Sequence, residues 1–207
     1  DAVSGWLGGS SCVLFLVASF SLLSVWGGAA FRCPAGNAGF QHVSPEELKM
    51  TTAPLAPGAA AIILFRQVER DDMGHTAHEN DYFRIKILTE EGRKYADIEI
   101  PYFKDRGGVT AIRARTIRPD GSIAEFDGKV FDKSIAKAKG LKYLAKTFTL
   151  PDVQVGSIIE YYYTIDLAEH FVFDSHWILS NELFTKSARF PLKPYHSAYG
   201  PMAVPWA

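Results

Sequence analysis

Cysteine is scarce in this chain of 207 residues, which contains only Cys12 and Cys33. Two cysteines cannot form the set of disulfides that holds many small secreted domains together. The chain is long enough to bury a core without such links. Both cysteines flank an apolar segment near the N-terminus, and removal of that segment would leave Cys33 alone in a tail. We therefore expect neither a disulfide framework nor a catalytic cysteine.

Catalytic sequence motifs are also lacking. No Gly-rich loop is followed by Lys-Ser or Lys-Thr to hold phosphate, and Ser157 lacks the sequence of a nucleophile elbow. His75 and His78, followed by Glu79, offer metal-ligand chemistry, but this spacing brings two histidines together on a helix. The segment from Asp71 to Asn80 is typical of a polar loop between strands. We predict no catalytic, cofactor-binding or metal-binding residues.

A strong charge of one sign is absent as well, since the formal net charge is −1 and the isoelectric point is near 6.7. This balance argues against a dedicated nucleic-acid-binding protein. The distribution is uneven, however, because residues 84–146 contain 15 basic and 9 acidic side chains. Six lysines between Lys129 and Lys146 form the most basic part, which we expect to be a mobile loop.

One long apolar run is present, from Val13 to Trp26. Its length fits the apolar part of a signal peptide and falls short of the ~20 residues that a spanning helix needs. Gly28 and Ala30 stand at the −3 and −1 positions of a cleavage site before Phe31. Residues 1–30 are thus predicted to be a signal peptide whose start is truncated, and the alternative is an uncleaved membrane anchor. Either implies an exported protein of the periplasm or cell envelope.

Residues 31–59 are rich in Ala, Gly and Pro and are predicted to be a tether. One short helix is expected within it, over residues 45–50. Ser44 stands at the capping position, Pro45 at the first helical position, and Glu47 three residues after the cap. This capping box predicts that the helix docks the tether onto the rest of the chain.

Two β-hairpins are expected next. In the first, residues 82–89 pair with residues 94–102 through a four-residue loop. That register gives one apolar face and one face of opposite charges, which a shift by one residue would destroy. The apolar pairs are Phe83 with Ile100, Ile85 with Ile98 and Ile87 with Ala96; the charged pairs are Arg84 with Glu99 and Lys86 with Asp97.

The second expected hairpin pairs residues 112–118 with residues 122–127 through the turn Pro119-Asp120-Gly121. It places Arg115 opposite Glu125 and Arg113 opposite Asp127. These pairings would account for much of the basic excess as the solvated face of a sheet.

Further strands are predicted over residues 61–68, 157–166, 171–179 and 188–192. The first is apolar throughout, as in a strand buried on both faces. Short strands with turn signals between them and no long helical periodicity predict an all-β domain over residues 60–207, an antiparallel β-sandwich or open barrel. Truncation at its C-terminus is one interpretation of the sequence.

Glu160 lies within the apolar stretch from Ile158 to Ile165, which is predicted to form a strand. A buried carboxylate needs a partner, because an unpaired buried charge is costly. Arg113, Arg115 or a tyrosine hydroxyl are candidate partners. We expect an internal ion pair or an exposed position at a sheet edge, and the alternative is an acid that orients a ligand.

Three stretches carry a family resemblance: Arg84 to Gly92, Arg115 to Gly121, and Phe148 to Pro151 followed by Val155 to Tyr161. In this order they resemble the uncharacterised β-rich domain that precedes transglutaminase-like domains in exported bacterial proteins. The resemblance covers about residues 60–191. It implies an accessory domain with a papain-like catalytic domain elsewhere in the intact protein, and it transfers no functional residues.

Two functions remain open from the sequence. The first is a non-catalytic accessory or scaffold domain, with its own downstream transglutaminase-like domain as partner. The second is a module that binds an envelope polymer or an anionic surface through the loop from Lys129 to Lys146. Binding of this second kind should weaken steeply as salt is added.

Overall fold

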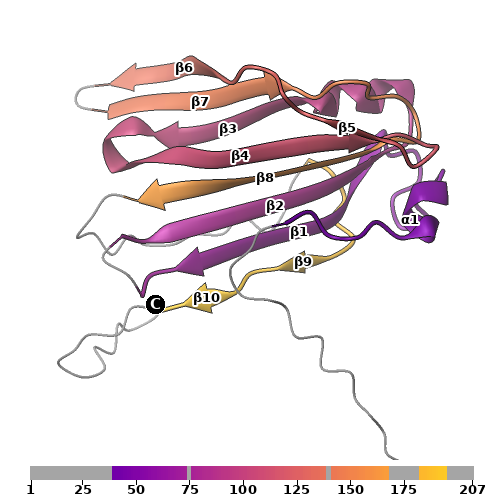
Figure 1. The fold of residues 1–207 in the computed structure, drawn as a ribbon, viewed down its shortest axis with the longest axis horizontal. Coiled ribbons are helices and arrows are strands. Elements are labelled where there is room, and N and C mark those ends of the chain that lie inside the picture. Colours follow the sequence, from indigo (N-terminus) through magenta and orange to yellow (C-terminus); the bar gives the residue numbers. More distant parts are fainter. Residues whose placement is uncertain (1–38, 74–75, 139–140, 168–181, 195–207) are drawn as a thin grey trace, which may run out of the picture. The chain divides into compact units, whose positions relative to one another are not determined.

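The fold is known from a computed structural model, which describes residues 39–73, 76–138, 141–167 and 182–194 (Figure 1). The chain divides into Asp1–Asn37 and the compact unit Ala38–Ala207, and the described residues belong to the second. No helix within those ranges is long and apolar enough to span a membrane. Several predictions fall outside the described residues: the signal segment, Cys12, Cys33, His75 and the strand over residues 171–179.

The larger of two sheets has the strand order β10-β1-β2-β8-β4-β5, with β9 also paired to β1. Its main strands are antiparallel, whereas the two-residue strands β9 and β10 run parallel to β1. The all-β prediction is thus confirmed, with mixed rather than purely antiparallel pairing. The strands are β1 (Ala61–Asp71), β2 (His78–Ile87), β4 (Gly107–Ile117), β5 (Ile123–Glu125), β8 (Ile158–Leu167), β9 (Ala188–Arg189) and β10 (Leu192–Lys193).

The smaller sheet has three strands in the order β3-β7-β6, and all of them pair antiparallel. They are β3 (Asp97–Phe103), β6 (Phe131–Ala138) and β7 (Leu141–Thr149). Short 3-10 helices, η1 (Glu90–Ala96) and η2 (Lys104–Arg106), flank β3 where the chain passes between the sheets. The one α-helix of the described residues is α1 (Pro45–Lys49).

Alternate side chains of the two sheets meet in one apolar cluster. Ile85 on β2 and Ile159 on β8 share it with Ile98 and Ile100 on β3. Because neighbouring residues of a strand point to opposite faces, this defines an inner face of the large sheet, which carries Ile85, and an outer face. The outer face carries the even-numbered residues of β2 and β8.

The first predicted hairpin is wrong. β2 pairs with β1 and β8, and β3 pairs with β7 in the other sheet. The intended loop forms η1, where the Gly92 N–H donates to the Thr89 carbonyl at 3.1 Å. A side chain on Gly92 would collide with the backbone of Ala60. The apolar residues were assigned correctly to a common core, but they meet across two sheets instead of along one ladder.

The second predicted hairpin is confirmed for its core pairs, because β4 and β5 place Arg115 opposite Glu125. Gly121 has φ of +86°, the left-handed conformation that the turn requires. The pairing of Arg113 with Asp127 lies beyond the end of β5. By contrast, the loop predicted from Lys129 to Lys146 is wrong, since β6 and β7 form an antiparallel pair there.

The N-terminal segment of the described chain packs on the outer face of the large sheet. A second apolar cluster joins Ile62 of β1 and Ile158 of β8 to Leu48 and Met50. Helix α1 begins at the predicted capping box, since Ser44 accepts from the Glu47 N–H and Glu47 accepts from the Ser44 N–H. We call residues 39–50 the strap, which includes α1 (Figure 1).

Candidate functional site

A row of charged side chains crosses the outer face of the large sheet, and Glu160 lies at its centre. In the sheet register, Arg84 of β2 is directly opposite Glu160 on one side, and Arg115 of β4 is directly opposite it on the other. Side chains of directly opposed residues lie on the same face of a sheet. Strand pairing therefore places one carboxylate between two guanidinium groups.

The carboxylate of Glu160 has no exposed surface, and its hydrogen-bond partners are all side chains. Arg84 donates from Nε to Oε1 at 2.8 Å, and Arg115 donates from Nε to Oε2 at 2.7 Å. The Tyr82 hydroxyl also donates to Oε1. Burial, followed by the negative charge of Glu160, raises the pKa of Tyr82 above its ordinary value. The tyrosine thus remains a hydrogen-bond donor at neutral pH.

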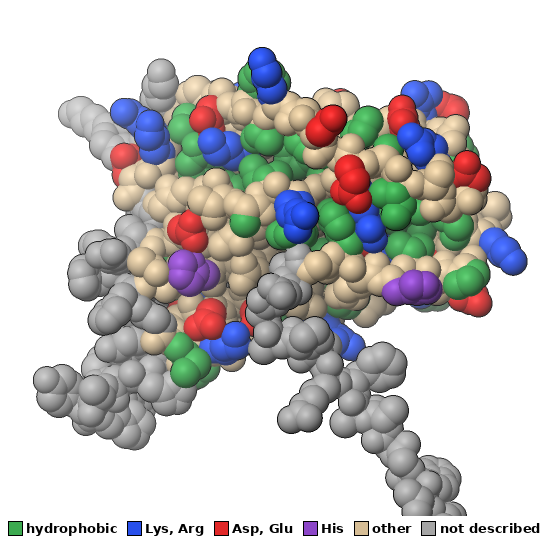
Figure 2. Space-filling model, viewed as in Figure 1, with side chains coloured by type: hydrophobic (Ala, Val, Ile, Leu, Met, Phe, Trp, Pro, Cys, Tyr) green, Lys and Arg blue, Asp and Glu red, His purple; other side chains and the backbone are tan. Residues whose placement is uncertain are grey.

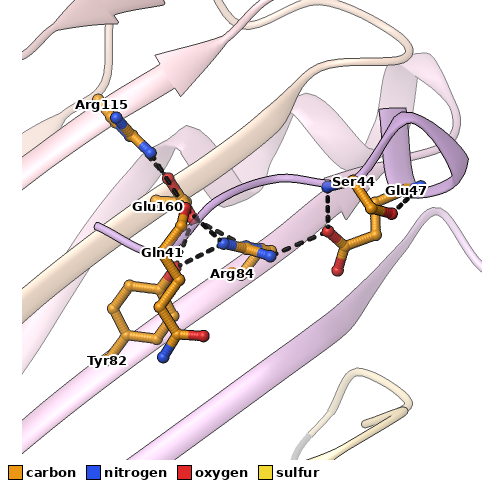
Figure 3. A network of polar contacts seen from close by, with 7 residues as sticks. All are labelled: Gln41, Ser44, Glu47, Tyr82, Arg84, Arg115 and Glu160. Carbon is orange, nitrogen blue, oxygen red and sulfur yellow. Dashed lines mark hydrogen bonds and ion pairs between the residues drawn. The ribbon is translucent and has the colours of Figure 1, made fainter. Parts of the chain in front are cut away.

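The guanidinium of Arg84 connects this row to the strap, as Figure 3 shows. Its Nη1 donates to Oε2 of Glu47 at 2.9 Å, and its Nη2 donates to the Gln41 carbonyl at 2.9 Å. Arg115 reaches the same carbonyl through Nη2 at 3.4 Å. Every nitrogen of the Arg84 guanidinium therefore has a partner, and the capping carboxylate of α1 is held by the sheet.

Lys86, two residues along β2, holds the end of the same helix. Its Nζ donates to the carbonyl of Leu48 at 2.7 Å and to that of Gly156 at 2.5 Å. The side chain is completely buried. Burial lowers the pKa of Lys86 to about 8, because removal from water disfavours the ammonium form.

The other end of the strap is held by its aromatic side chain. The rings of Phe40 and Tyr162 meet edge to face, with centroids 5.7 Å apart. The guanidinium of Arg115 lies over the Phe40 ring, 4.3 Å from its centroid, in cation–π contact. The strap is thus fixed at Phe40, Gln41, Glu47 and Leu48.

A second polar row crosses the outer face near the other end of the strands, where Asp71, His78 and Asp166 are directly opposed on β1, β2 and β8. Nδ1 of His78 lies 2.8 Å from Oδ1 of Asp166, and its Nε2 lies 3.0 Å from the Thr76 hydroxyl. Thr110 donates to the other oxygen of Asp166 at 2.7 Å. The side chains of His78 and Asp166 are 44% and 41% exposed.

The order hydroxyl, imidazole, carboxylate in this second row is one that the sequence did not predict. It arises because Thr76 and His78 are two residues apart and β2 pairs with β8, a pairing that was not among the sequence predictions. Among the described residues, no group of three His, Cys, Asp or Glu side chains is arranged to hold a metal ion.

A further buried acid, Asp81, lies on the inner face of β2 and has one carboxylate oxygen without a partner among the described residues. Burial raises its pKa to about 7, and the nearby charge of Glu79 adds to the effect. It is not in contact with the strap.

Sequence reasoning and structure agree on Glu160 more than on its neighbours. The internal ion pair and two of the predicted partners, Arg115 and a tyrosine, are present. Arg84 and Lys86 were assigned to a solvated face, yet they are 4% and 0% exposed because the strap covers them. The capping box was the signal that could have found them, since the Glu47 carboxylate of a docked helix needs a cationic partner such as Arg84, and the negative C-terminal end of the helix favours a cation such as Lys86.

The predicted lysine-rich site is altered by the β6–β7 pairing. Lys133 donates to Glu99 at 2.6 Å, and Lys146 pairs with Asp132 at 2.8 Å. Figure 2 shows basic and acidic side chains interspersed on the face that it presents. Two of the six lysines are therefore already neutralised by acids of the small sheet.

The comparisons with known proteins define the class. The model of a family described as a domain of unknown function with a solved structure, DUF3857, matches residues 75–199. The match spans more than half of the chain, so the chain belongs to this family. The residues of the buried row lie within the matched region, and the strap lies outside it.

Among solved structures, the chain is similar to a crystal structure described as that of a "putative protease" from Parabacteroides distasonis. The TM-score is 0.48 and the identity 15%, over 53% of this chain and 23% of that one. This chain thus corresponds to less than a quarter of that protein's length. The comparison with curated proteins found no match.

Proposed function

We propose that this chain is a non-catalytic accessory domain of an exported bacterial protein, which positions a transglutaminase-like domain outside the cytoplasm. The observation that carries the proposal is the buried row around Glu160. Its charged side chains contact one another and the strap, and they thereby fasten the strap onto the sheet. This is the chemistry of a scaffold.

The identity of the partner rests on the family resemblance in the three sequence stretches. The exported location rests on the apolar run from Val13 to Trp26 and its small residues before Phe31. In the proposed arrangement the strap fastens residues 39–50 to the sheet, and this holds whether the apolar run is a cleaved signal or an inner-membrane anchor.

The proposal is tested in the intact protein and in this chain alone. The isolated chain should show no turnover of peptide, glutaminyl or glycan substrates. Glu160→Gln in the intact protein should alter the melting transition of this domain and the KM of the attached enzyme, with less effect on its kcat. Turnover by the isolated chain would overturn the proposal.

Binding of an envelope polymer or anionic surface through the β6–β7 hairpin is the second candidate. The exposure of Phe131 and Ile135 beside the lysines supports it. Retention on anionic vesicles should fall steeply between about 50 and 200 mM salt if this surface binds them, because exposed charges are screened. Retention that does not change with salt would contradict it.

A further inference from the structure

The part of the large sheet beneath the strap carries an excess of positive charge. Arg84, Lys86 and Arg115 contribute three cations, and Glu160 contributes one anion, which leaves a formal charge of +2. The strap supplies the carboxylate of Glu47 together with carbonyl oxygens. The sheet surface is therefore electrostatically complementary to an acidic peptide with exposed carbonyls.

The contacts also divide into a receptor side and a ligand side. The receptor side consists of long side chains from adjacent, hydrogen-bonded strands, which hold them in a fixed pattern. The ligand side consists of two backbone carbonyls, one carboxylate and one ring, all within residues 39–50. Recognition of main-chain groups between two side-chain anchors is how proteins commonly bind short peptides.

The strap brings its own local structure to this surface. Both hydrogen bonds of the capping box join Ser44 to Glu47, so the cap itself is formed by residues of the strap. The described contacts of Phe40, Gln41 and Glu47 with the sheet do not require that strap and sheet belong to one polypeptide. A strap from another molecule would present the same groups.

We propose that the outer face of the large sheet is a peptide-binding surface, that the strap is its resident ligand, and that the surface binds the strap of a second copy when the resident strap is loosened. Arg84 binds the acidic side chain of the peptide, which is Glu47 in the strap. Tyr162 and Arg115 bind its aromatic side chain, which is Phe40. This inference does not depend on the accessory function proposed above.

The test measures binding of a fluorescent peptide of residues 39–50, acetylated and amidated to remove its terminal charges. The receptor is the full chain with Phe40→Ala and Glu47→Ala, whose own strap is loosened. We expect saturable binding to this variant and at least tenfold weaker binding to the wild-type chain. The resident strap competes at an effective concentration that is in the millimolar range for short connections.

Two control peptides identify the contact. A peptide with Glu47→Gln should bind at least tenfold more weakly, because Nη1 of Arg84 then meets a neutral amide in place of a carboxylate. Glu46 is adjacent in the same turn but exposed, and a peptide with Glu46→Gln has the same net charge as the first control. Its affinity should stay within about twofold of the native peptide. Equal losses for both controls, or no saturable binding by the folded variant, would overturn the proposal.

A second measurement avoids any change in the receptor. A peptide with a photo-reactive benzoylphenylalanine in place of Phe40 is incubated with the wild-type chain long enough for straps to exchange, and then irradiated. Mass spectrometry should locate the crosslink at Tyr162 or within residues 113–115. Crosslinks spread over the whole protein, or none, would contradict the proposed binding surface even if the double variant failed to fold.

Discussion

Two polar rows cross the outer face of the same sheet, and they differ in what covers them. The row of Arg84, Glu160 and Arg115 is buried beneath the strap, whereas the row of His78 and Asp166 is partly open to solvent. They lie six residues apart on the shared strands, about 20 Å at the usual rise of a strand. Each row crosses three neighbouring strands. The first crosses β2, β8 and β4 with Glu160 at its centre, and the second crosses β1, β2 and β8 with His78 at its centre.

Burial, more than the types of residue present, determines how much a charged row contributes to the stability of the fold. An exposed ion pair is screened by water and adds about 0 to 1 kcal/mol. A buried pair is costly to form, but removal of one partner leaves an uncompensated charge and costs about 3 to 5 kcal/mol. The same residue types therefore give a weak link in one row and a latch for the strap in the other.

Substitution of the two central acids should show the largest difference. Glu160→Gln should lower the free energy of unfolding by about 3 kcal/mol, because two buried guanidinium groups lose their counter-charge. Asp166→Asn should lower it by about 1 kcal/mol or less. Urea denaturation at pH 7 measures both values. Glu125→Gln, in an exposed acid opposite Arg115, is the control, and similar losses for all three variants would remove the contrast.

The pH dependence of stability should come next in size and is specific to the buried side. Lys86 has a pKa of about 8 in the folded chain and near 10.5 when unfolded. Between these values the unfolded state binds more protons, so stability should rise with pH. We expect a gain of about 2 kcal/mol from pH 8 to pH 10 that is missing in Lys86→Met.

The rise of stability with pH should end near pH 10. Tyr82 has a raised pKa in the folded chain, so above pH 10 tyrosine ionises first in the unfolded state and stability falls again. Urea midpoints at intervals from pH 7 to pH 10 make the comparison between wild type and Lys86→Met. Curves that run parallel would show that Lys86 is not desolvated as the structure places it.

A hydroxyl removed from each row gives a finer comparison. Tyr82→Phe deletes one donor to the buried Glu160 and should cost about 1.5 kcal/mol, since hydrogen bonds to charged groups contribute more than neutral ones. Thr110→Val deletes one donor to the partly exposed Asp166, where water replaces it. Its cost should stay below about 0.5 kcal/mol. Thermal melts of the two variants would contradict the comparison if Thr110→Val were the more damaging.

The strap itself should show a smaller effect than the side chains of the buried row. Ser44→Ala removes the cap of α1 and should lower stability by about 1 kcal/mol, a typical cost for an N-cap. Because it loosens the start of the helix that holds Glu47, it should also speed amide exchange at the N–H of Leu48. Ser134→Ala on β6, away from the strap, should leave that exchange rate unchanged. An unaltered rate in Ser44→Ala would show that the cap does not secure the strap.

Local signals in the sequence were sufficient for several elements. The capping box at Ser44 and Glu47 and the turn at Gly121 depend on residues within a few positions of one another, so the sequence alone predicted them. The alternation of apolar residues in β2 also predicted correctly which of its side chains enter the core. It left open whether two such strands pair side by side or face each other from two sheets, and the first hairpin failed on that point.

The amino-acid sequence by itself determined that this chain is all-β, which side chains are apolar, and where one short helix begins, because these depend on periodicity and on neighbouring residues. Only the tertiary structure decided that Glu160 lies between Arg84 and Arg115 and that the strap covers them. That outcome depends on which strands become neighbours. Strand order is set by the packing of the whole core, and no short stretch of sequence contains that information.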